Sequence, residues 1–180
     1  MIYIKDRNLS ILSLLYKNYS STFKDNKMKN ILIALDYGLS ARLVAEKGYE
    51  LAKSMNARIT LLHVVADESY YSSLDSTPFV GFYGHDFFNL EGNENLIQSS
   101  LNFLNKIKHH LKDESIHVLA EQGDFATVIL DTATKQHANI IVLGSHSKNW
   151  LERTIMGSVT ENVLTKTKIP MFIIPVKEHN

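Results

Sequence analysis

The sequence predicts one α/β domain in which helices cover both faces of a parallel sheet. Short continuous apolar runs, which are typical of strands buried on both faces, alternate with longer segments of helical period. This alternation continues without a break over most of the chain, as in doubly wound folds. The 180 residues are 44% hydrophobic and 21% charged, which is ordinary for a globular protein and sufficient for one full core.

Five segments are predicted as strands because each is short and mainly apolar. They are residues 30–35, 58–65, 116–121, 140–143 and 170–174. The third is the most polar of the five. Pro175 is expected to close the last strand, since proline is poorly tolerated inside a sheet.

Helices are predicted in the intervals between these strands. Ser40 is expected to cap the first helix, which ends at Asn56. A helical period returns from Glu94 to Leu111, and Asp124 is expected to cap the next helix. The inner face of the first helix is a stripe of Val44, Gly48, Leu51, Ala52 and Met55. Residues 66–93, rich in tyrosine and phenylalanine, show no period and predict a long loop, either a lid, a partner surface or a segment folded onto the domain.

The run IIVLGSHSKNWLERTIMGSV, residues 140–159, has the parts of a phosphate site. Gly144 is expected to turn the backbone sharply at the end of a strand and to let it approach a ligand. Gly157 and Ser158 open a helix that runs to about Thr167, and its first N–H groups and dipole favour an anion. Ser158 also matches a capping box with Glu161, which needs no ligand.

Composition argues against several classes of function. The formal net charge is zero, so the chain has no electrostatic footprint for nucleic acid or a lipid surface, and no apolar run is long enough to span a membrane. Cysteine is absent, which fits a reducing compartment, and we expect a cytoplasmic protein. No carboxylate or cysteine completes a metal site with His109, His110 and His117. No nucleophile–base pair is recognisable, so we do not expect an enzyme.

Residues 1–27 are predicted to be a poorly structured extension, because MKNILIAL, which begins at Met28, looks like a natural start. The domain would then span residues 28–176. A signal peptide is the alternative, since the apolar stretch Leu9 to Tyr16 follows two basic residues. Serines interrupt that stretch and no small-residue cleavage site follows it.

Three segments of the chain resemble the universal stress protein (UspA-like) family. They are NILIALDYGLSAR, LLHVV and GSHSKNWLERTIMGSVTENVL, the last of which resembles the family signature Gly-x2-Gly-x9-Gly-Ser/Thr. The resemblance covers nearly all of the chain after Met28. It implies the adenine nucleotide alpha hydrolase-like (HUP) architecture, with five parallel strands in the order 3-2-1-4-5. That order places Asp36 and Gly144 together at the switch between strands one and four, where open sheets bind ligands.

The same resemblance implies roles for individual residues in binding ATP or a related adenine nucleotide; it does not indicate whether Mg²⁺ takes part. Asp36 would contact the ribose, and Val64 or Val65 the adenine. The phosphate loop and its surroundings would be Leu143, Gly144, His146, Ser147, Gly157, Ser158 and Val159. His146 could touch a phosphate or be only a polar loop residue. The family's second loop glycine is Ser147 here, which either weakens binding about tenfold or donates its own hydrogen bond to phosphate.

The expected function is that of a small protein whose nucleotide biases the binding of an unknown protein partner. A protein–protein interaction module with a degenerate nucleotide site and a weak nucleotidase are the alternatives. A homodimer is expected through Met171–Ile174, because this apolar last strand would lie at an edge of the sheet and its flanking prolines would limit the pairing.

Overall fold

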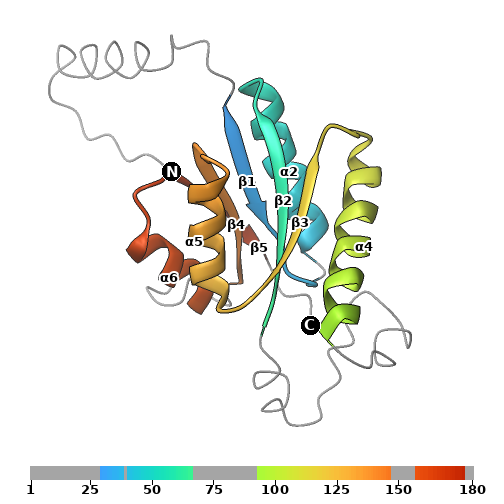
Figure 1. The fold of residues 1–180 in the computed structure, drawn as a ribbon. Coiled ribbons are helices and arrows are strands. Elements are labelled where there is room, and N and C mark those ends of the chain that lie inside the picture. The colour runs from blue at the N-terminus through green and yellow to red at the C-terminus, as the bar shows by residue number, and fades with distance from the viewer. Residues whose placement is uncertain (1–28, 39, 67–92, 147–156, 177–180) are drawn as a thin grey trace, which may run out of the picture.

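The computed structural model describes residues 29–38, 40–66, 93–146 and 157–176. Within these ranges five strands form one parallel sheet in the order β3-β2-β1-β4-β5, which confirms the predicted order (Figure 1). The strands are β1 (Asn30–Ala34), β2 (Arg58–Val65), β3 (His117–Gln122), β4 (Ile140–His146) and β5 (Met171–Val176). The predicted extension, residues 1–27, lies outside the described residues, as does almost all of the predicted loop 66–93.

The described helices cover both faces of the sheet. They are α2 (Ala41–Ser54) and α4 (Asn93–Leu111) on one face, and α5 (Phe125–Lys135) and α6 (Ser158–Lys166) on the other (Figure 1). Successive side chains of a strand point to opposite faces, so β1 divides its residues between two cores. Ile31 and Ile33 pack toward α2 and α4, whereas Leu32 packs toward α5 and α6. The doubly wound α/β prediction is therefore confirmed.

Several predicted strand boundaries are wrong by a few residues. β4 runs to His146 rather than ending at Leu143, and β5 runs to Val176 and includes Pro175. The two extensions depend on each other, because Gly144 to His146 pair with Ile174 to Val176. Proline is tolerated in β5 since this is an edge strand, on which alternate N–H groups point away from the sheet.

One of the predicted helix caps is confirmed and two are wrong. Asp124 has an extended backbone (ψ 126°), and its side chain accepts a hydrogen bond from Thr127 N at 3.0 Å. Ser40 makes no side-chain cap bond, because its backbone is already helical (φ −84°, ψ −10°). The N-cap of α6 is Gly157 and not Ser158, so Ser158 and Glu161 do not form a capping box.

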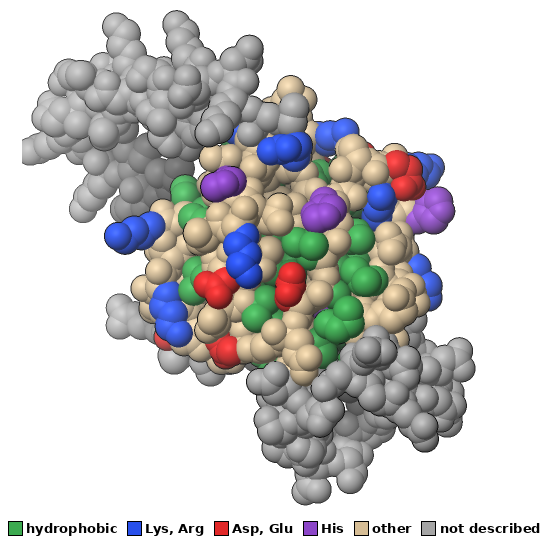
Figure 2. All heavy atoms as spheres, viewed as in Figure 1, with side chains coloured by type: hydrophobic (Ala, Val, Ile, Leu, Met, Phe, Trp, Pro, Cys, Tyr) green, Lys and Arg blue, Asp and Glu red, His purple; other side chains and the backbone are tan. Residues whose placement is uncertain are grey.

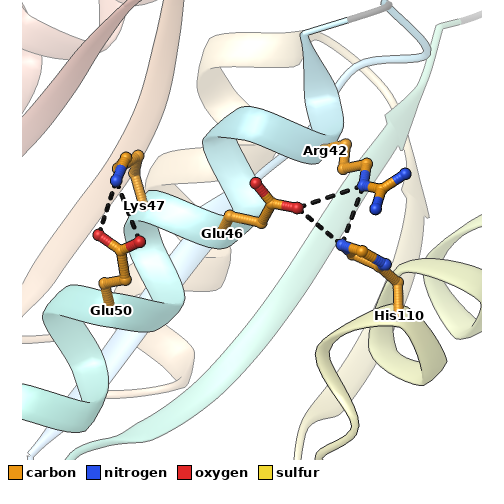
Figure 3. A network of polar contacts seen from close by, with 5 residues as sticks. All are labelled: Arg42, Glu46, Lys47, Glu50 and His110. Carbon is orange, nitrogen blue, oxygen red and sulfur yellow. Dashed lines mark hydrogen bonds and ion pairs between the residues drawn. The ribbon is translucent and has the colours of Figure 1, made fainter.

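Polar contacts on the surface tie α2 to the C-terminal end of α4. Glu46 Oε1 accepts from Arg42 Nε at 3.2 Å and lies 2.7 Å from His110 Nε2, so that His110 points from α4 to α2 (Figure 3). Lys53 Nζ, two turns further along α2, donates to Asp113 Oδ2 at 3.0 Å just after the end of α4. Hydrogen bonds from Ser115 and Lys53 lower the pKa of Asp113 to about 2. These surface ion pairs link α2 to the end of α4, and pairs of this kind typically contribute little to stability.

The face of the molecule that Figure 2 shows is mixed in charge. Lysine, arginine, acidic and histidine side chains are interspersed over the face that Figure 2 shows, with hydrophobic side chains between them. No helix in the described ranges is long and apolar enough to cross a membrane.

Candidate functional site

The predicted switch point lies at the carboxyl ends of β1 and β4. These neighbouring strands pair in register from Ile31–Ile140 to Ile33–Val142, and continuing that register brings Leu35 opposite Gly144. The chain leaves β1 for α2 on one face and reaches α6 after β4 on the other. Because the two connections diverge, the space above this pair of strand ends is where an open sheet of this kind binds ligands.

Asp36 is the second residue after β1, and its side chain is exposed. Its Oδ1 atom accepts a hydrogen bond from Gly38 N at 3.0 Å, so part of its role is to close the turn that leads into α2. A carboxylate accepts about four hydrogen bonds, so this contact is compatible with a second role toward a ligand.

The backbone directions separate the two candidates on β2. Leu62 O accepts from Leu35 N at 2.9 Å and therefore faces β1, whereas Val65 O accepts from Gly123 N at 2.9 Å and faces β3. Since successive peptide groups of a strand alternate in direction, Val64 faces the side of β1. The pairing with β1 reaches only Leu62, so the peptide edge of Val64 borders the switch point. Both valine side chains are buried, so a ligand would meet Val64 through its backbone.

Gly144 does not turn the chain, contrary to the prediction. It lies inside β4, paired with Ile174, and Gly123 is the described glycine with a positive φ. A Cβ atom at Gly144 would lie 2.9 Å from Val44 Cγ2 of α2. A glycine is therefore required at position 144 because α2 packs closely against β4 there. Leu143 is buried in the opposite core, and His146 is the last residue of β4 rather than a loop residue, because β4 continues along β5.

The start of α6 is held against β4 at Gly144. Thr160 Oγ1, in the first turn of α6, donates to Gly144 O at 3.0 Å, and Thr160 is buried. Gly157 precedes this turn, Ser158 is exposed, and Val159 packs partly against the α5–α6 core. Gly157 and Ser158 therefore begin the turn whose Thr160 hydroxyl contacts Gly144. The sequence analysis missed Thr160, which makes the contact. Ser147 lies outside the described residues.

Ser145 is a second residue that the sequence analysis missed. It is 5% exposed and lies on the same side of β4 as Ile141 and Leu143, the side that α5 and α6 cover. Within the part of the chain that the structure describes, its hydroxyl has no hydrogen-bond partner. Buried hydroxyl groups are usually paired, so Ser145 is a candidate donor to a ligand at the start of α6.

The histidines of α4 and β3 form no metal centre in the described part of the chain. His110 contacts Glu46, and His109 Nδ1 lies 3.8 Å from Glu114 Oε1. Among the residues that the structure describes, no group of three or more histidine and carboxylate side chains could hold an ion.

A sequence model of the universal stress protein family matches residues 27–175. The chain belongs to this family. It is 28% identical over 174 residues to the universal stress protein MJ0531 of Methanocaldococcus jannaschii, an alignment that covers 93% of this chain and 96% of the relative.

Solved structures of universal stress proteins share this fold. The structure of MJ0577 from Methanocaldococcus jannaschii has a TM-score of 0.57 and 27% identity, and the match covers 84% of this chain and 97% of that one. A universal stress protein from Archaeoglobus fulgidus, solved in complex with dAMP, has a TM-score of 0.53 at 19% identity, covering 81% and 97% of the two chains. Another, solved with cAMP, has a TM-score of 0.51 at 15% identity, covering 81% and 95%.

Proposed function

We propose that this universal stress protein binds ATP or a related adenine nucleotide at the switch point between β1 and β4. The observation that carries the proposal is the hydrogen bond from Thr160 to Gly144 O, which holds the first turn of α6 beside the ends of these strands. The N–H groups of that turn and the helix dipole favour phosphate there. The dAMP and cAMP complexes of family members support an adenine nucleotide as the ligand class.

Each part of the nucleotide has a proposed partner. The Asp36 carboxylate would accept hydrogen bonds from the ribose hydroxyls, and the Val64 peptide would meet the adenine edge. The phosphates would lie against the backbone of Gly157, Ser158 and Val159, with the Ser145 hydroxyl as a further donor. His146 and Ser147 remain candidates for the same subsite.

We propose a binding role rather than catalysis, because the candidate site offers one exposed carboxylate and no base paired with a nucleophile among its described residues. Nucleotide occupancy would bias the binding of a protein partner in the cytoplasm. The alternative function is an interaction module that binds no nucleotide, and the serine at position 147 is the observation that favours it.

We also propose a homodimer through β5. This strand is at an edge of the sheet, and Phe172 is 40% exposed on it. An apolar edge of this kind invites pairing with a second copy, and the proline within it limits the number of hydrogen bonds that a partner strand gains.

Calorimetric titration with ATP tests the nucleotide proposal. Gly157→Val should abolish binding, because the new side chain fills the space that the phosphate needs; a Cβ atom there meets no atom of the described residues within 4 Å. Thr165→Val, at the exposed far end of the same helix, is the control and should bind as the wild type does. Ser147→Gly should leave the affinity equal or raise it, and a clear loss would identify the serine as a ligand. A wild-type chain that binds no ATP at millimolar concentration supports the interaction module instead.

A further inference from the structure

His63 is a buried, titratable side chain beside the candidate site that the proposed nucleotide contacts do not use. It belongs to β2, is 5% exposed, and lies on the α2–α4 side of the sheet. Its ring centroid is 4.0 Å from that of Tyr37 and 5.9 Å from that of Phe103. Burying a polar imidazole in an apolar site costs more free energy than burying an aliphatic side chain, which points to a specific role for His63.

The hydrogen bond of His63 shows which of its two ring nitrogens carries the hydrogen. Nδ1 lies 2.8 Å from Leu35 O, and a carbonyl oxygen only accepts, so Nδ1 carries the hydrogen. Burial lowers the pKa of His63, against the opposing effects of the Leu35 carbonyl and of the Asp36 charge. The ring is therefore neutral near pH 7, with Nδ1–H donating to the peptide group that joins Leu35 to Asp36.

Tyr37 holds the other side of Asp36. Its hydroxyl is 2.7 Å from Ser100 Oγ, and Ser100 Oγ donates to Leu96 O at 2.7 Å. Because the one hydroxyl hydrogen of Ser100 is used on α4, the Tyr37 hydroxyl must donate to Ser100. The Tyr37 ring also lies 5.0 Å from that of Phe103. Tyr37 is thus fastened to α4 through its ring and through its hydroxyl.

We propose that His63, Tyr37 and Ser100 form a clamp that positions the Asp36 carboxylate for the ribose. The clamp fixes the residue on each side of Asp36, whose own side chain is exposed. A carboxylate held in place before binding loses less freedom on meeting a ligand, which is how a positioning residue raises affinity. The inference rests on the proposed nucleotide site. It adds that β2 and α4, and not β1 alone, determine the ribose contact.

Two ligands and a double-mutant cycle test the clamp. His63→Leu and Tyr37→Phe should weaken ATP binding about fivefold to tenfold, as expected for one lost hydrogen bond. They should leave binding of 2′,3′-dideoxy-ATP unchanged, because that ligand lacks the ribose hydroxyls. In an Asp36→Ala background neither substitution should weaken ATP binding further, since both act through Asp36. His63→Gln, whose amide can donate to Leu35 O, should restore part of the loss.

A readout without nucleotide separates the clamp from the nucleotide proposal. Gly38 N donates to Asp36 Oδ1 at 3.0 Å, and Thr127 N donates to Asp124 Oδ1 at the same distance on the far side of the sheet. In Tyr37→Phe and Ser100→Ala, hydrogen exchange measured by NMR should quicken at Gly38 and stay constant at Thr127. Thr134→Ala, which removes a comparable hydroxyl bond to Leu130 O on α5, should change neither amide.

The outcomes distinguish the two ideas. Faster exchange at Gly38 in a chain that binds no ATP overturns the nucleotide proposal and keeps the clamp as a device that orders Asp36. Unchanged exchange at Gly38, or equal losses of ATP and dideoxy-ATP affinity in the clamp variants, overturns the clamp. A neutral His63 found by NMR with its hydrogen on Nε2 also overturns it.

Discussion

Substituting Gly144 with alanine tests whether this glycine serves packing rather than a turn. The new Cβ atom would lie 2.9 Å from Val44 Cγ2, about 1 Å closer than carbon atoms pack. Val44 is 3% exposed, and a β-branched side chain in a helix has one strongly preferred rotamer, so rotation gives little relief. α2 must therefore move from the sheet. Overpacking of this size costs about 1–3 kcal/mol, which lowers the Tm by roughly 3–9 °C for a domain of this length.

Thermal unfolding followed by circular dichroism, without nucleotide, measures this effect. Gly157→Ser is the matched control, because a Cβ atom at Gly157 meets no atom of the described part of the chain within 4 Å and serine is a favoured N-cap; its Tm should stay within about 1 °C of the wild type. In a Val44→Ala background, Gly144→Ala should cost much less, since the clashing methyl group is gone. A Gly144→Ala chain that melts with the wild type would refute the packing argument and return the glycine to a role in ligand approach alone.

Four further outcomes follow from the described contacts. Asp124→Ala should lower the free energy of unfolding by about 1 kcal/mol in urea titrations, whereas Ser40→Ala, which removes no cap bond, should change it by less than half as much. Burial lowers the pKa of His63 in the folded chain below its usual value of 6.5. The stability that neutral His63 contributes is therefore complete above pH 6.5 and is lost as the pH falls through the folded pKa. His63→Gln should flatten that part of a curve of stability against pH, and an unchanged slope would contradict the assignment. Phe172→Lys should give monomers in sedimentation at tens of micromolar, and a wild type that is already monomeric there counts against the β5 interface. A chain that starts at Met28 should melt cooperatively near the full-length Tm; loss of folding would show that residues 1–27 belong to the domain.

The family could be predicted from the sequence because its motifs are local, and the sheet order followed from the resemblance to that family rather than from the strand pattern itself. The apolar run from Arg58 to Val65 matched β2 in full, since a strand buried on both faces is mainly apolar along its whole length. The cap at Asp124 was also predictable, because an N-cap bond joins residues three apart.

The sequence predicted which segments contribute to the candidate site but not the contacts within it. A strand followed by glycine looks the same whether the glycine turns the chain or receives a helix, and only the approach of Val44 to Gly144 decided between them. The N-cap of α6 is Gly157 rather than Ser158, and the hydrogen bond from Thr160 to Gly144 O joins two residues that are 16 apart in the sequence. In the sequence, His63 is one polar residue in a mainly apolar strand, and Ser100 is one of many polar residues in a helical segment, so neither stands out. Their partners, Leu35 and Tyr37, lie 28 and 63 residues away. The sequence by itself determined backbone propensity, periodicity and family. The tertiary structure alone decided which distant side chains meet, because such contacts depend on strand order and register rather than on local pattern.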